Sequence, residues 1–126
     1  MVKKITICVL LAIIIGGSFL QHHYVTGATE DLKSDLNEIY NALQSDDFEK
    51  ALSASQTFSE NWEKEKILYE TLFKHEEVDL ISSGAARLIE MCGQADKPEA
   101  LAETAETLYY INHIHEIDSI KFENIF

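Results

Sequence analysis

The chain has 126 residues and a formal net charge of −12 at pH 7, from 22 acidic and 10 basic side chains. All 22 acids but only 8 of the basic residues lie in residues 29–126, so this part alone carries a net charge of −14. Such an acidic field disfavours nucleic acid and anionic lipid head groups as partners. The length of residues 29–126 suits one domain with a single core.

The first element is an uncharged apolar stretch at residues 5–20, ITICVLLAIIIGGSFL. As a helix it would be about 24 Å long, which is short of the roughly 30 Å of hydrocarbon in a bilayer. The uncharged residues 21–25 can supply the missing turn. Because Lys3 and Lys4 favour a cytoplasmic N-terminus, the sequence predicts a single-pass membrane anchor over residues 5–25, with the remaining chain outside the cytoplasm.

The same stretch also fits a cleaved signal peptide, which has a basic start, an apolar centre and a cleavage site with small residues. Only loose matches to such a site follow, at residues 25–27 and 26–28, and neither has the Ala-x-Ala pattern. We therefore favour the anchor, and cleavage would instead give a secreted domain. The expected division is residues 1–27 for the anchor and a short linker, and residues 28–126 for the acidic domain.

The first two helices of the domain are expected from their apolar seams. Residues 26–29 are expected to form a short break between the anchor helix and the domain, with Thr29 as the N-cap of a helix over residues 30–44. A turn at residues 45–47 then supplies the next cap. The second helix is expected over residues 47–73, because neither Gly nor Pro interrupts this span.

A third helix is expected over residues 76–92, with Gly93 as its C-terminal cap. Gly84 in its middle would allow a neighbouring helix to approach closely. The strongest local signal in the domain follows, because Asp96 can cap a fourth helix and Pro98 fits the first turn of that helix.

The fourth helix is expected to end at about residue 119, before an apolar tail over residues 120–126. This tail is expected to fold back onto the bundle, and a docking peptide is the alternative. No segment alternates with a period of two over a length that would make a strand. The sequence therefore predicts an all-α protein, with an N-terminal transmembrane helix followed by an antiparallel bundle of about four helices.

Aromatic and cysteine residues have simple expected roles. Trp62, Tyr69 and Phe73 lie at helical spacing and are expected in the core. Cys8 lies in the apolar stretch and Cys92 in the domain, so the bilayer would separate them and prevent a disulfide. Cys92 is expected to be a small buried hydrophobic residue, with an intermolecular disulfide as the alternative.

Three stretches are familiar in combination: Trp62, HEEVD at residues 75–79, and HIHEID at residues 113–118 leading to NIF at residues 124–126. With the short anchor and the total length, the chain resembles an uncharacterised bacterial family, domain of unknown function 4363. The resemblance covers essentially the whole chain. It implies a single-pass protein with a small extracytoplasmic helical domain, working in the cell or spore envelope beside another membrane protein, and it implies no catalytic activity.

The sharpest candidate site is a cluster of histidines and carboxylates on the third and fourth expected helices. His75 and Asp79 share one helix face, and His113 and Glu116 share another. If these faces meet, the four side chains could bind a divalent cation such as Zn²⁺. Two alternatives stay open, namely interhelical hydrogen bonds and ion pairs that fix the register, which we favour, and a pH-sensing histidine pair.

No pattern in the sequence predicts an enzyme or a cofactor other than that metal. Ser82 and Ser83 near His75 lack the surrounding motif of an activated nucleophile. The Glu-x-x-His pattern of di-iron bundles and the His-Glu-x-x-His pattern of zinc proteases are both absent. His22 and His23 would lie at the outer interface, where they could touch a metal or a head group, although a juxtamembrane pair without such a role is favoured.

These observations predict a membrane-anchored, non-enzymatic accessory or interaction protein whose acidic bundle packs on a membrane or envelope partner. The candidate contact residues are apolar and aromatic and lie near the C-terminus: Tyr110, Phe122, Ile125 and Phe126. The alternative is a metal- or pH-responsive extracytoplasmic binding domain that uses the histidine and carboxylate cluster.

Overall fold

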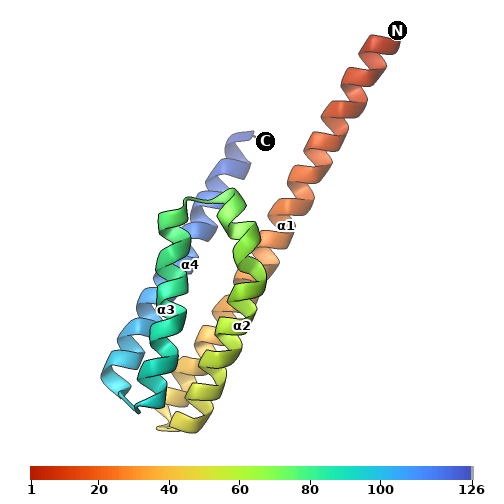
Figure 1. Cartoon of the computed structure of the whole chain (residues 1–126). Helices are drawn as coiled ribbons and strands as arrows, with labels where there is room; N and C mark the ends of the chain where they lie inside the picture. Colours follow the sequence, from red (N-terminus) through yellow and green to blue (C-terminus); the bar gives the residue numbers. More distant parts are fainter. Residues whose placement is uncertain (126) are drawn as a thin grey trace.

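The computed structural model describes residues 1–125, with side chains to residue 124, and these residues form four α-helices joined by short turns (Figure 1). The helices are α1 (Val2–Gln44), α2 (Phe48–Leu72), α3 (His75–Gly93) and α4 (Lys97–Ile125). Each helix packs on the next, and α4 returns to pack on α1, which closes an antiparallel ring. The predicted all-α bundle is therefore confirmed, with helices close to the expected ranges for α2 and α3.

The expected break between anchor and domain was wrong, because α1 continues through residues 26–29 without interruption. Thr29 is fully buried within the helix and is not an N-cap. No Pro occurs here, and Gly27 alone costs a helix only about 1 kcal/mol. Burial of Val25 and Thr29 against the bundle offsets that cost, so the apolar stretch and the first bundle helix form one helix.

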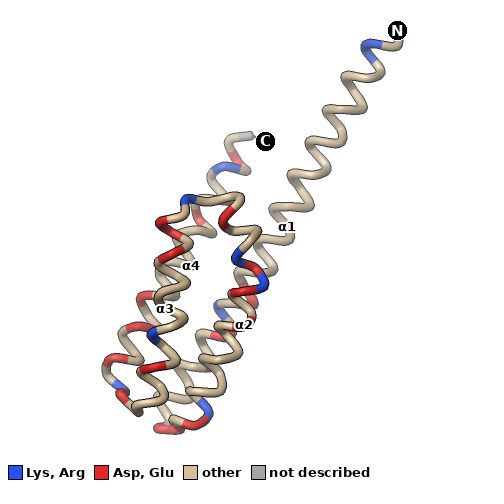
Figure 2. Tube along the Cα trace, viewed as in Figure 1, with Lys and Arg blue, Asp and Glu red and all other residues tan. Residues whose placement is uncertain are grey.

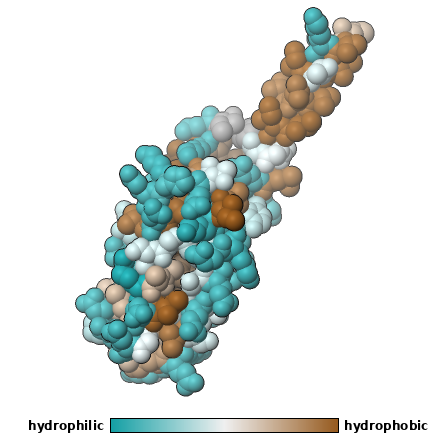
Figure 3. All heavy atoms as spheres, viewed as in Figure 1, coloured by the Kyte–Doolittle hydropathy of each residue, from teal (hydrophilic) through white to brown (hydrophobic). Residues whose placement is uncertain are grey.

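The N-terminal part of α1 projects beyond the bundle as a rod (Figure 1), and the face of this rod seen in Figure 3 is largely apolar, in line with its many exposed large hydrophobic side chains. We call residues 5–20 the apolar segment. The most apolar 18-residue window of α1 has a mean hydropathy of 2.0, and none of it is buried within the protein. By length and composition α1 is therefore a candidate membrane span, although a signal sequence would have the same properties.

The core lies along the axis of the bundle and contains side chains from all four helices. The predicted seam of the first bundle helix is buried, and so are Trp62, Tyr69 and Phe73, as expected. The largest fully buried side chains include Phe58, Trp62, Tyr69, Leu32, Leu36, Ile81, Leu88 and Ile111. Each such side chain contributes about 1.5–3 kcal/mol by leaving water, so apolar burial is the main source of stability. Cys92 is buried among these residues, as predicted.

Each of the two turns at the end of the bundle opposite the apolar segment contains one residue in the left-handed conformation, Asp46 in the first and Ala95 in the second. Asp47 caps α2 by accepting a hydrogen bond from the backbone N–H of Lys50 at 3.1 Å, as expected. Gly93 is not the expected cap, because it is the last residue of α3 and the left-handed conformation falls on Ala95 instead. The Ala95 and Asp96 amides donate to carbonyl oxygens of the last turn of α3, and this completes the turn without a glycine.

The expected end of the fourth helix at about residue 119 was also wrong, and the tail does not fold back. α4 continues to Ile125, beyond the turn between α2 and α3 and alongside α1 (Figure 1). The Phe122 ring meets the Phe19 ring edge-on, with 5.1 Å between centroids. No Gly or Pro follows Pro98, and the projecting part of α1 offers a surface for two further turns of α4.

The close approach of α3 and α4 at Gly84 was expected and is present. A Cβ added to Gly84 would collide with the Thr107 hydroxyl and come within 3.3 Å of Glu103 Oε1. We predict that Gly84→Ala lowers the free energy of unfolding by about 1–3 kcal/mol, because overpacking forces the helices apart. Chemical unfolding of the full-length protein in detergent, followed by circular dichroism, measures this change.

Gly93→Ala is the matched control, since its Cβ would meet only Leu52 Cδ1 within 4 Å, at 3.9 Å. Its free energy of unfolding should stay the same or rise by up to about 1 kcal/mol through higher helix propensity. If both variants unfold at the same denaturant concentration, the close approach at Gly84 does not exist.

Candidate functional site

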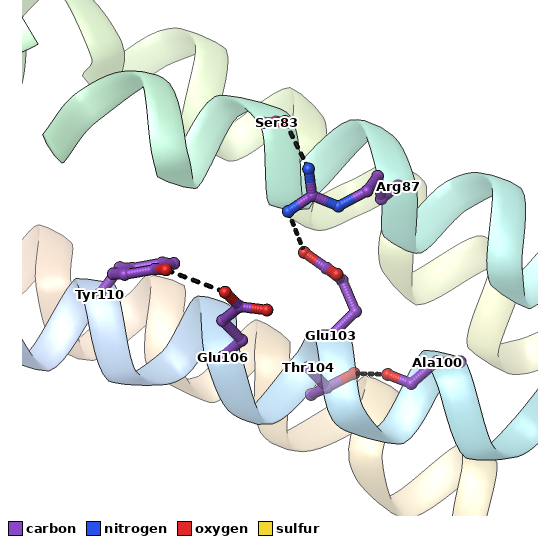
Figure 4. Close-up of polar contacts among 7 residues, drawn as sticks. All are labelled: Ser83, Arg87, Ala100, Glu103, Thr104, Glu106 and Tyr110. Carbon is purple, nitrogen blue, oxygen red and sulfur yellow. Dashed lines mark hydrogen bonds and ion pairs between the residues drawn. The ribbon is translucent and has the colours of Figure 1, made fainter. Parts of the chain in front are cut away.

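The helix contacts include two polar clusters that the sequence did not specify. The first lies on the seam between α3 and α4 (Figure 4), where Arg87 reaches across to Glu103 with 2.7 Å between Nη2 and Oε1. The second lies at the proximal end of the bundle, which we define as the end from which the apolar segment projects. The two clusters differ in how many of their polar groups have a hydrogen-bond or ion-pair partner within the protein.

The charged groups of the α3–α4 cluster are paired with each other. The Glu103 side chain is 8% exposed, and the Arg87 guanidinium that pairs with it also donates to the Ser83 hydroxyl at 2.7 Å. The hydrogen bond that Arg87 donates to the Glu103 carboxylate raises the pKa of Arg87, which therefore stays charged. A buried carboxylate without a partner would be costly, so this pair holds α3 and α4 in one register. One turn along α4, the Tyr110 hydroxyl donates to Glu106 (Figure 4).

The proximal end contains a partly open cavity of about 140 Å³, which we call the proximal pocket. Water in the liquid occupies about 30 Å³ per molecule, so the pocket has room for a small group of atoms. Three helices and the turn after α2 contribute to its wall. Its lining residues are Ser18, Gln21, His22, Leu72, Phe73, Asp118, Lys121 and Phe122.

A buried carboxylate forms one wall of the proximal pocket. Asp118 is 8% exposed, and its Oδ2 lies 2.8 Å from Nδ1 of His22. An Nδ1–H tautomer of His22 donates this hydrogen bond, which compensates part of the cost of burying the carboxylate. The bond joins α4 to α1 just beyond the apolar segment.

Aromatic rings complete the pocket. The Phe122 ring stacks on the His22 ring, with 4.1 Å between centroids and 10° between planes. The Nζ of Lys121 lies 5.7 Å from the centroid of the Phe73 ring, within the range of a cation–π contact. The last turns of α4 thus contact α1 and the turn after α2.

A second set of hydrogen bonds fixes α1 to α2 next to the pocket. The Thr29 and Tyr69 hydroxyls lie 2.7 Å apart in the buried interior. At the surface, the Tyr24 hydroxyl donates to both carboxylate oxygens of Glu65, at 2.8 and 3.1 Å. Burial raises the pKa of Tyr69 to about 12, and the hydrogen bond with Thr29 opposes this shift only in part.

The four predicted metal ligands do not converge. His113 lies 3.7 Å from Glu77, measured from Nε2 to Oε1, so its carboxylate neighbour on α3 is Glu77 and not Asp79. His75, Asp79 and Glu116 have exposed side chains. Over the described part of the chain, no three His, Cys, Asp or Glu residues are placed to hold a metal ion. Ser82 also has another role, since its hydroxyl accepts the indole N–H of Trp62 at 2.9 Å.

The predicted contact residues have different surroundings. Tyr110 is half-buried against the core, and the exposed tyrosine of the pair is Tyr109, at 64% exposure. Phe122 packs on α1 as described above. The side chain of Ile125 and all of Phe126 lie outside the described residues, so their role as contacts stays a prediction.

The sequence contains one signal for the proximal pocket, a carboxylate among apolar positions. Asp118 occupies a position on the apolar seam of α4, where a carboxylate needs a partner. For His22 the sequence predicts only a place in a juxtamembrane histidine pair. The pairing required a continuous α1 and a longer α4, and neither was predicted.

Comparison with protein families matches residues 19–125 to the family described as Domain of unknown function (DUF4363). The chain belongs to this family. The match begins at Phe19, whose ring contacts Phe122, and ends at the last residue of α4. This DUF4363 domain therefore includes the contacts between α1 and the end of α4 at the proximal pocket, as well as the bundle. No curated protein and no solved structure matched the chain.

The raised pKa of Tyr69 predicts a loss of stability in alkali. In the unfolded chain a tyrosine ionises near pH 10, whereas Tyr69 in the bundle ionises near pH 12. Its contribution is complete below about pH 10 and is lost as the pH rises through about 12, because the unfolded state releases the proton first. The melting temperature of the full-length protein should fall over this interval.

Tyr69→Phe should make this fall shallower, and Tyr40→Phe, which changes an exposed tyrosine on α1, is the control. Thermal melting by circular dichroism at a series of pH values measures all three proteins. An identical alkaline profile for Tyr69→Phe and the unmodified protein would contradict the burial of this phenol.

Proposed function

We propose that this DUF4363 protein is a membrane-anchored, non-enzymatic interaction protein of the bacterial cell or spore envelope. Its apolar segment forms the membrane anchor without residues 21–25, because His22 and Val25 in that stretch contact the bundle. Its acidic bundle stands on the outer surface, where it packs on a membrane or envelope partner. The observation that carries the proposal is the continuity of α1 from the apolar segment into the core. A continuous helix fixes the bundle at a set height and direction relative to the membrane.

The contacts of α1 favour a retained anchor over a cleaved signal peptide. Cleavage near residues 25–28 would remove Phe19 and His22, which hold the end of α4, and Val25, which is fully buried. The bundle would then expose the Phe122 ring and leave the Asp118 carboxylate without its imidazole partner. The two lysines before the apolar segment support a cytoplasmic N-terminus.

A non-enzymatic role is supported by how the buried polar groups are used. The Arg87–Glu103 pair, the Thr29–Tyr69 bond and the Trp62–Ser82 bond each join two helices. The alternative, a metal- or pH-responsive domain built on His75, Asp79, His113 and Glu116, gains no support from their arrangement. The exposed Tyr109 and its stacking neighbour His113 on α4 are instead our candidates for a contact surface.

The test is photo-crosslinking in intact membranes. We expect full-length protein with Tyr109→p-benzoylphenylalanine to sediment with membranes and to form one discrete cross-linked product with another envelope protein. The control places the same photoreactive residue at Ser53, which is exposed on α2, a helix that does not pack on α4.

Replacement of residues 1–20 should release the protein from the membrane fraction and abolish the product at residue 109. Full-length protein found only in the soluble fraction would contradict the anchor. A membrane-bound protein that gives the same products from residues 53 and 109 would contradict the proposed contact surface.

A further inference from the structure

The proximal pocket lies at the level where the apolar segment ends. Ser18, in the last turn of the apolar segment, lines the pocket, and Phe19 contacts Phe122 on its opposite wall. Because α4 is antiparallel to α1, its last turns point along the apolar segment (Figure 1). If the anchor of the proposed function spans a bilayer, on which this inference rests, the pocket opens among the lipid head groups of the outer leaflet.

α4 contributes one negative and one positive side chain to the wall of the pocket, namely Asp118 and Lys121. Asp118 Oδ2 accepts the hydrogen bond of His22, whereas Oδ1 has no hydrogen bond to any described residue. Lys121 has no ion-pair partner among the described residues, and its ammonium lies over the Phe73 ring. Charged groups of both signs are thus available to a ligand within one turn of one helix.

The surroundings of the pocket also suit lipid. Ile120, in the same part of α4, is 57% exposed, and the Phe73 and Phe122 rings form the apolar part of the wall. Aromatic and aliphatic side chains beside lysine are typical of segments that lie in the membrane interface. A ligand with a charged head and an apolar body would therefore match both parts of the proximal end.

We propose that the proximal pocket binds the head group of a zwitterionic phospholipid that has a primary ammonium, the phosphoethanolamine type. In the complex, Lys121 Nζ donates a hydrogen bond to the lipid phosphate, and the primary ammonium of the lipid donates one to Asp118 Oδ1. The acidic field of the domain disfavours anionic head groups, which bring only negative charge. A quaternary ammonium lacks an N–H donor for the Asp118 carboxylate, so a choline head group binds less well.

The test uses full-length protein in nanodiscs that contain phosphatidylethanolamine, phosphatidylcholine and phosphatidylglycerol in equal amounts. Native mass spectrometry then identifies the lipid that stays bound after the nanodisc is removed. Phosphatidylethanolamine should predominate. Lys121→Met, which keeps an apolar stem over Phe73, should lower its retention by about tenfold, since a charge-assisted hydrogen bond is lost.

Lys121→Arg should retain the lipid because it keeps the charge. Lys97→Met is the matched control, because it removes a lysine at the opposite end of the bundle that pairs with Asp46 at 2.9 Å. Asp118→Asn should reduce the preference for phosphatidylethanolamine over phosphatidylcholine. Retention that is equal for the three lipids, or unchanged in Lys121→Met, would overturn the proposal.

Soluble phosphoethanolamine is added in a separate arm as a competitor. If it displaces the lipid completely at equal concentration, the ligand is a free metabolite and the lipid assignment is wrong. Failure of the full-length protein to enter nanodiscs would overturn the anchor of the proposed function and this inference together. A protein that enters nanodiscs but shows no lipid selectivity overturns the pocket assignment alone.

Discussion

The structure depends on the continuity of α1, which passes from the apolar segment into the core without a break. Its burial at Val25 and Thr29 keeps the helix intact where Gly27 would weaken it. Because the same helix extends beyond the bundle, it offers α4 a surface on which to continue as far as Phe122. The proximal pocket is a consequence of these two long helices meeting.

Acidic charge and polar contacts have separate roles in the domain. Most carboxylates are exposed to solvent, and the acidic residues are spread over all four helices within the bundle (Figure 2). Buried carboxylates are few among the described residues, and each is paired: Glu103 with Arg87 across the α3–α4 seam, and Asp118 with His22 at the proximal end. The first pair sets helix register, whereas the second leaves one carboxylate oxygen available at the pocket.

Local patterning was sufficient to predict much of the fold. The apolar seams gave the number of helices in the bundle, although not their continuity with the apolar segment, and the Asp47 and Asp96 caps gave two of their starting points. The unbroken α1 and the long α4 could not be predicted, because both depend on tertiary burial that outweighs local signals such as Thr29. The neighbours of the candidate metal ligands could not be predicted for a related reason: the spacing of apolar residues does not fix the relative height of two helices, and His113 lies next to Glu77.

The most direct test of the continuous α1 is amide hydrogen exchange of full-length protein in lipid bilayers, read by mass spectrometry over residues 22–32. A continuous helix predicts that these amides exchange as slowly as those of residues 32–42, which lie within the bundle. The turn at residues 94–96, which lies between α3 and α4, gives the rate expected for a loop. Exchange of residues 26–29 at that loop rate would show a hinge between the apolar segment and the bundle, and it would contradict the account.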